Sequence, residues 1–251
     1  MAEPLPDLTI CVAGVESLQT VRRFLRSVEE TAGPVGLEVF VITSGGQEQA
    51  AVLAAEYPDL TVVEQASGRF LNLTINEVIA RSTGRYFSVW DSASVVSAGC
   101  LLSLVDFLDE TPDAGVAGPK MRDERGAIQQ TARTFPSFFS LLFAAQYPPG
   151  QPAAGWHEYA GGEADWYAGP GITCSRLLLD DIGGLHPNLP LYWPIELGLR
   201  ARRAGWHVHY LNDAQATGSL AAWQQTFSMG RETPWRGLWE ACLLAATWRL
   251  R

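Results

Sequence analysis

Short apolar runs alternate with longer amphipathic segments through the first third of the chain, and this alternation constrains the fold more than any other feature. The apolar runs lie at residues 8–14, 37–46, 60–65 and 85–90. Apolar side chains recur at helical spacing between them, in residues 16–30, 48–57 and 70–82. Strands that alternate with helices at this spacing predict βαβ units and a mostly parallel sheet flanked by helices.

The second half continues the α/β pattern less regularly. Residues 98–115 predict a helix, 114–121 a strand and 122–137 a turn with a hairpin. Residues 144–164 are rich in Pro, Gly and Ala, which is typical of a long loop. In residues 167–185 we expect a strand, then a short helix that ends at a Gly-Gly pair. In residues 195–211 we expect a helix that ends at Gly205, followed by a strand.

Composition narrows the function. The chain has 251 residues, 47% of them hydrophobic, enough for one large domain with or without a C-terminal extension. A formal net charge of −9 disfavours nucleic acid as a partner, because phosphates are repelled. The four cysteines lie far apart and suggest neither a zinc site nor a disulfide framework. With no signal peptide and no run of about 18 apolar residues, we expect a cytoplasmic protein.

Four stretches of the chain resemble the family 2 glycosyltransferases of GT-A fold, especially the rhamnosyltransferase-like branch. They lie at residues 84–121, 125–137, 165–185 and 191–215, and the resemblance as a whole runs from about residue 8 to 218. It implies a Rossmann-like GT-A domain over residues 1–220, followed by a C-terminal helical extension over residues 221–251.

The resemblance also implies a chemistry. Such enzymes transfer a sugar, with inversion, from a nucleotide-sugar donor to a glycan or lipid-linked acceptor. A divalent cation offsets the charge on the departing diphosphate, and a carboxylate takes the proton of the acceptor hydroxyl. On this basis the expected catalytic residues are Glu196 and Asp91. The expected donor-binding residues are Thr43, Asn76, Asp91 and Arg133, and the expected acceptor-binding residues are Asp165 and Trp166.

Several positions depart from the family pattern. Gly14 follows the first strand where the family has an Asn-Tyr-Asn type stretch, and Ala93 stands where a second metal-binding acid is expected. Gly218 and Ser219 replace a metal-facing histidine, and the acidic loop that carries the base is shortened to residues 193–196. The resemblance implies Mg²⁺ or Mn²⁺, but the second acid is absent, so we assign no metal ligand.

Two readings therefore stay open: a transferase with an altered site, and a binding or partner subunit that has lost its donor site. A third, an unrelated nucleotide-binding domain, is disfavoured because no glycine-rich phosphate loop follows the first strand.

Each candidate residue also has a structural interpretation. Asp91 could cap a strand end, Glu196 could favour the dipole of a helix start, and Arg133 could form a structural ion pair. Trp166, next to Asp165, could be a core tryptophan. His207 and His209 alternate on one strand face but lie outside the family's metal position.

The C-terminal residues 233–251 predict an apolar helix that contains Trp235, Trp239 and Trp248. Such a helix could dock on the domain, form a homodimer contact, or lie on the inner face of a membrane as a peripheral anchor. Docking or dimerisation is favoured, because the helix carries few cations.

Overall fold

The computed structural model describes residues 5–15, 17–135 and 161–228. The strands in these ranges are β1 Leu8–Ala13, β2 Leu37–Thr43, β3 Leu60–Glu64, β4 Tyr86–Asp91, β5 Val95–Val96, β6 Ala114–Arg122, β7 Ala132–Arg133, β8 Gly162–Ala164, β9 Trp166–Tyr167, β10 Ile172–Ser175 and β11 His207–Thr217. The helices are α1 Leu18–Thr31, α2 Gly46–Glu56, α3 Leu71–Arg81, α4 Cys100–Glu110, α6 Arg176–Ile182, α7 Trp193–Arg203 and α8 Leu220–Ser228.

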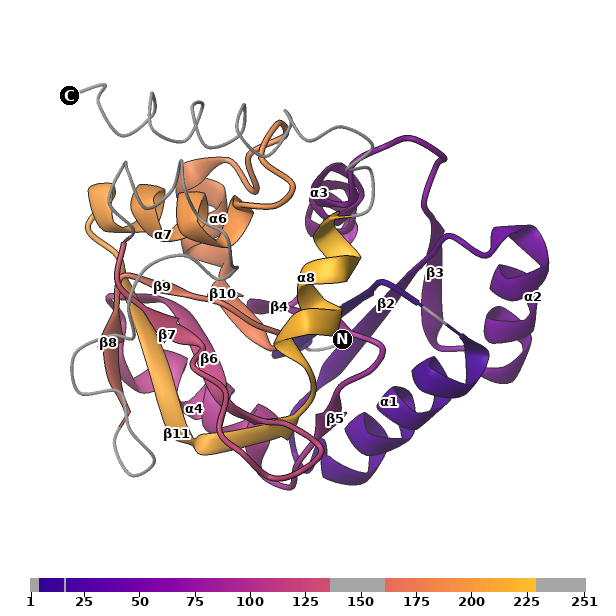
Figure 1. The fold of residues 1–251 in the computed structure, drawn as a ribbon, viewed down its shortest axis with the longest axis horizontal. Helices are drawn as coiled ribbons and strands as arrows, with labels where there is room; N and C mark the ends of the chain where they lie inside the picture. The colour runs from indigo at the N-terminus through magenta and orange to yellow at the C-terminus, as the bar shows by residue number, and fades with distance from the viewer. Residues whose placement is uncertain (1–4, 16, 136–160, 229–251) are drawn as a thin grey trace.

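One large mixed sheet runs through the molecule in the order β3-β2-β1-β4-β10-β6-β11-β5, with β8 paired to β11 (Figure 1). Strands β1 to β4 pair in parallel, as the βαβ pattern predicts. Strand β10 enters antiparallel between β4 and β6, so β4, β6 and β11 all point the same way. The carboxyl ends of β1, β2, β4, β6 and β11 therefore share one edge of the sheet.

Helices cover both faces of the sheet. Apolar side chains of α1 and α4 pack with one face, in a cluster that includes Ile10, Phe24, Trp90 and Leu104. Those of α3, α6, α7 and α8 pack with the other face, in a cluster that includes Phe87, Leu178 and Trp223. A continuous apolar run suits a strand buried on both sides, which explains why β1 and β4 are buried along their whole length.

Local signals fix the ends of several elements. Ser17 and Thr20 form a reciprocal capping box at the start of α1. Gly183 ends α6 with φ +75°, a conformation that glycine adopts without strain. The expected helix and strand in residues 195–211 are α7 and β11, with Gly205 between them. The predicted C-terminal helix at 233–251 and most of the predicted loop at 144–164 lie outside the described residues.

Candidate functional site

The carboxyl edge of the sheet is where an open α/β fold binds its ligand, and Asp91 lies there at the end of β4. Its side chain is 1% exposed. Its Oδ1 atom accepts hydrogen bonds from the backbone N–H of Ser94 at 2.8 Å and from the hydroxyl of Ser94 at 2.7 Å. Asp91 therefore holds the turn that follows β4, as the strand-cap interpretation describes.

The backbone around this turn is tied to its neighbours. Ser92 donates its hydroxyl to the carbonyl of Gly14 at 2.9 Å, and Arg23 of α1 donates to the carbonyl of Ala93 at 2.8 Å. The turn that follows β4 is thus hydrogen-bonded both to the end of β1 and to α1.

Thr43, at the end of β2, is 1% exposed. Its hydroxyl donates to Gln49 of α2 and accepts from the backbone N–H of Gly45 at 3.1 Å. The side chain therefore fixes the β2–α2 connection.

Asn76 reaches from α3 to the backbone after the Gly-Gly stop. Its amide donates to the carbonyl of Leu185 and accepts from the N–H of the same residue, each at 2.8 Å. Asn72, one turn earlier, donates to the carbonyl of His186. Both asparagines anchor the segment that leads to α7.

Glu196 lies in the first turn of α7 and is 2% exposed. Arg200 holds both of its carboxylate oxygens, with N–O distances of 2.5 and 2.7 Å. The same guanidinium donates to the carbonyls of Ile182 and Gly184. The pair joins α7 to the end of α6.

The predicted acceptor residues lie together with Arg133 at the small two-stranded sheet of β7 and β9, where Arg133 pairs in register with Trp166. Asp165 accepts from the N–H of Phe135 at 2.7 Å and from Arg202 at 2.8 Å. Trp166 is fully buried, and its indole N–H donates to the carbonyl of Thr134 at 3.0 Å. These contacts match the structural interpretation of Trp166 as a core tryptophan with an acid beside it.

Helix α8 was not predicted as a part of the site, yet it lies across the carboxyl edge. It contacts β4, and a Cβ atom on Gly14 would lie 2.4 Å from Cγ2 of Thr226. Trp223 and Phe227 of α8 pack on Trp193 of α7, with ring centroids 6.2 and 5.4 Å away. In the sequence, the apolar residues at positions 220, 223 and 227 follow helical spacing, and this pattern could have predicted the helix.

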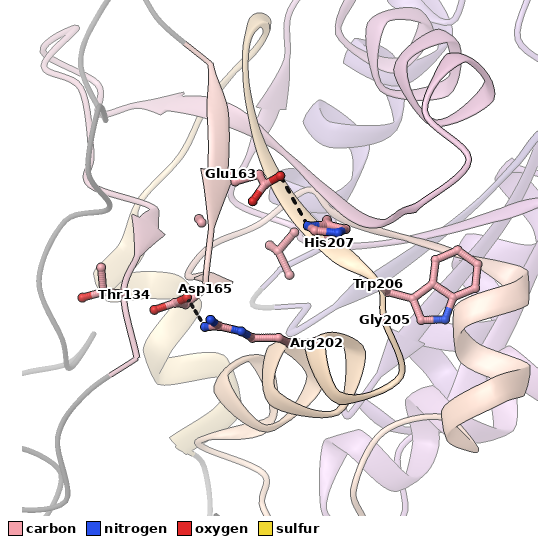
Figure 2. Close-up of a pocket in the computed structure, with 9 residues that line it drawn as sticks. Thr134, Glu163, Asp165, Arg202, Gly205, Trp206 and His207 are labelled. Carbon is pink, nitrogen blue, oxygen red and sulfur yellow. Dashed lines mark hydrogen bonds and ion pairs between the residues drawn. The ribbon is translucent and has the colours of Figure 1, made fainter.

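A cavity of about 360 Å³ lies at the start of β11, away from the carboxyl edge (Figure 2). Figure 2 shows two contacts beside it, Asp165 with Arg202 and Glu163 with His207. This cavity contains no predicted catalytic residue.

The residues at the metal position do not fit a divalent cation. Asp91 is buried and bound to Ser94, Ala93 offers no ligand, and Gly218 stands in the place of the expected histidine. Within residues 5–15, 17–135 and 161–228, no cluster of three or more His, Cys, Asp or Glu side chains could hold a metal. His207 and His209 therefore belong to no such cluster.

The described cysteines are poor nucleophiles. Cys11, Cys100 and Cys174 are all buried. Burial raises the pKa of the Cys100 and Cys174 thiols to about 12, so neither forms a thiolate at neutral pH.

No helix in the described part of the chain has both the length and the apolar character needed to cross a membrane.

Comparison with known proteins identifies the relatives of this chain. A family model described as "Glycosyltransferase like family 2" matches residues 6–240. An N-acetylglucosaminyl-diphospho-decaprenol L-rhamnosyltransferase of Mycobacterium tuberculosis is 26% identical, over 86% of this chain and 76% of the relative.

Solved structures share the fold at lower identity. Staphylococcus aureus TarS 1–349 in complex with UDP-GlcNAc is 17% identical, with a TM-score of 0.66 over 96% of this chain and 66% of that chain. GalNAc-T7 with UDP, GalNAc and Mn²⁺ is 11% identical, with a TM-score of 0.66 over 86% of this chain and 44% of that chain. The predicted fold class, a GT-A sheet flanked by helices, is confirmed.

Proposed function

Because the chain belongs to the glycosyltransferase-like family 2, we propose that it transfers a sugar, with inversion, from a nucleotide-sugar donor to a glycan or lipid-linked acceptor. Two features support this proposal: the family match over residues 6–240, and the similarity to a rhamnosyltransferase whose name specifies a lipid-linked acceptor. We further propose residues 1–220 as the transferase domain and residues 221–251 as its C-terminal extension.

The burial of Asp91 and Glu196 is the observation on which we base their proposed roles. Among the residues that the structure describes, Asp91 and Glu196 are the only carboxylates classed as buried. Burying an ionised acid is costly unless it is paired or hydrogen-bonded, so buried acids that sit near a ligand edge are candidates for chemistry. Helix α8 contacts the elements that carry both. We assign Glu196 as the base for the acceptor hydroxyl and Asp91 as a donor contact, with no step through a metal.

Thr43 and Asn76 are proposed as donor contacts through the backbone that they position, and Arg133 as a further donor contact. Asp165 and Trp166 are proposed as supports of the acceptor side. The predicted helix at residues 233–251 is proposed as a docking or homodimer element, with a peripheral membrane contact as its alternative.

A second candidate is a non-catalytic partner subunit. The observation that favours it is the engagement of both acids, Asp91 by Ser94 and Glu196 by Arg200. Each acid is thus held by a neighbouring side chain, as a structural role requires.

The test compares donor binding and transfer. Wild-type protein and the D91N and E196Q variants are titrated with UDP, GDP and thymidine diphosphate, with and without Mn²⁺, while the melting temperature is followed. A ligand that binds only the native state raises the melting temperature. Transfer from the matching sugar nucleotide to a lipid-diphosphate-linked GlcNAc is then measured. Binding with transfer that falls at least about 100-fold in E196Q supports the enzyme. If no nucleotide binds, the partner-subunit reading replaces it.

A further inference from the structure

Helix α8 occupies the space beyond the ends of β1 and β4, which is the position where an open α/β sheet binds its ligand. Thr226 packs directly on Gly14, and only a glycine leaves room for it there. Thr226 and Phe227 are less than a tenth exposed, and Trp223 is 1% exposed. In Figure 1, α8 crosses the sheet between α3 and the pair α6 and α7.

The docking of α8 uses two anchor points besides Gly14. The ring of Trp193 in α7 packs at a tilt against the rings of Trp223 and Phe227, whose own centroids are 4.7 Å apart. Gln129 joins the other end: its amide donates to the carbonyl of Gly218 and accepts from the N–H of Leu220, each at 2.8 Å.

Ser219 caps the helix by accepting from the N–H of Ala222 at 3.3 Å. Gly218, which precedes this cap, packs so closely that an added Cβ atom would lie 2.8 Å from the hydroxyl of Ser94. The start of α8 is therefore attached to the same turn that Asp91 holds.

These contacts connect positions that otherwise look unrelated. Gly14 and Gly218 both differ from the family pattern; Gly14 is a docking position of α8, and Gly218 lies just before the helix, packed on Ser94. The departures at these two positions therefore suit the packing of a helix over the edge of the sheet.

We propose that α8 is an intramolecular lid that closes the donor site, so that a nucleotide-sugar binds only after α8 has left Gly14 and Trp193. The inference rests on the proposed sugar-transfer function. A protein whose binding-competent state is a minor population shows an affinity reduced by that fraction, and a change that weakens the closed state removes the penalty.

The first experiment reads the position of α8. T226C is introduced in a background in which Cys242 is replaced by serine, and the rate of maleimide labelling is measured. The native thiols at positions 11, 100 and 174 are buried and provide a low background. A nucleotide that binds only the open state increases the open fraction. We expect UDP, GDP or thymidine diphosphate to accelerate labelling severalfold.

The second experiment loosens the lid. W223A and F227A remove the aromatic contacts with Trp193, and Q129A removes both hydrogen bonds at the start of α8. Each is expected to bind the same nucleotide at least about tenfold more tightly than wild type. F107A is the matched control, because Phe107 belongs to α4 on the opposite face of the sheet.

The outcomes separate the lid from the function. Nucleotide binding to wild type that leaves labelling of T226C unchanged, with no gain of affinity in W223A, would overturn the lid and leave the transferase standing. A gain in F107A equal to that in W223A would show general loosening, which also overturns the lid. Failure of every variant to bind any nucleotide would refute the donor function and the lid with it.

Discussion

Glu196 and Arg200 show how one residue pair can be either structure or chemistry. The pair is buried on the side of the acid, with side-chain exposures of 3% for Glu196 and 23% for Arg200. Breaking a buried pair costs more than its net contribution to stability, because the remaining charge is left without a partner. Comparing the stability of Glu196 and Arg200 variants with their transfer activity therefore separates the structural role of the pair from a catalytic one.

We predict that E196Q lowers the free energy of unfolding by about 2–3 kcal/mol, because Arg200 loses its charged partner. Urea unfolding of E196Q, R200Q and the double variant measures the coupling between the two side chains. A coupling near zero, together with lost transfer at wild-type stability, would show that the carboxylate acts mainly as a base.

Gly14 combines a left-handed backbone with a close helix contact, at φ +65°. We predict that G14A destabilises the protein by about 2–3 kcal/mol, from strain in the backbone and from collision with Thr226. G33A is the control, since Gly33 has φ +59° and nothing within 4 Å of an added Cβ atom. Denaturation should show a smaller loss for G33A, and T226A should partly rescue G14A. Equal losses in G14A and G33A would contradict the proposed contact.

Among the helices and strands, the βαβ repeat with its parallel pairing was predictable, and the pairing of strands from the second half of the chain was not. The apolar runs and helical spacing placed β1 to β4 and α1 to α4 because each pattern is local. The antiparallel entry of β10 depends on contacts between distant strands, which no local pattern encodes. Short strands such as β7 and β9 exist only through their pairing with each other.

The candidate site was predictable as a set of positions but not as a set of contacts. Asp91 is at the end of a buried strand, as expected. Its bond with Ser94 and the bond of Glu196 with Arg200 depend on side-chain geometry. The position of α8 depends on the absence of a side chain at Gly14, which in the sequence resembles an ordinary turn glycine.

We expect His209 to make the stability of the fold depend on pH. It is half-buried, and burial lowers the pKa of its imidazole, as does His207, while Glu163 and Asp113 oppose this. The unfolded chain, with an imidazole pKa near 6.5, therefore takes up a proton before the folded chain does. Stability is unaffected at higher pH and falls as the pH drops below about 6.5.

We predict that H209Q flattens the dependence of melting temperature on pH between about pH 7 and 5. At pH 8 the imidazole is neutral in both states, so wild type and variant compared there give the effect of the substitution alone. An unchanged slope below pH 6.5 would show that other groups carry the pH dependence.

In the described part of the molecule helices cover both faces of the sheet, and α8 extends the apolar core of one face to the carboxyl edge. The core that includes Ala13, Trp193, Trp223 and Phe227 thus joins the sheet, α7 and α8 in one apolar cluster. The same packing that stabilises the fold therefore covers the edge at which we propose that a donor binds. We therefore expect that substitutions which weaken the packing of α8 lower the stability of the fold and increase access to this edge.

The opposite edge of the sheet is held by charge. Arg85, just before β4, binds Asp7 at 2.8 Å and Asp109 of α4 at 2.5 Å. The hydrogen bonds from Arg85 lower the pKa of both carboxyls. Their stabilisation is present above the unfolded values near 4 and is lost as the pH falls through the lowered folded values.

We predict that R85Q lowers the free energy of unfolding by about 1 kcal/mol at pH 7, a modest value because all three side chains are a third or more exposed to screening solvent. At acid pH, where both carboxyls are protonated, wild type and R85Q should converge. Urea unfolding at neutral and acid pH measures this. R22Q, which breaks the exposed pair with Glu56 at a different helix, serves as the control. A loss in R85Q that is the same at both pH values would show that packing of Arg85 on the ring of Tyr86, 5.3 Å away, outweighs its charge.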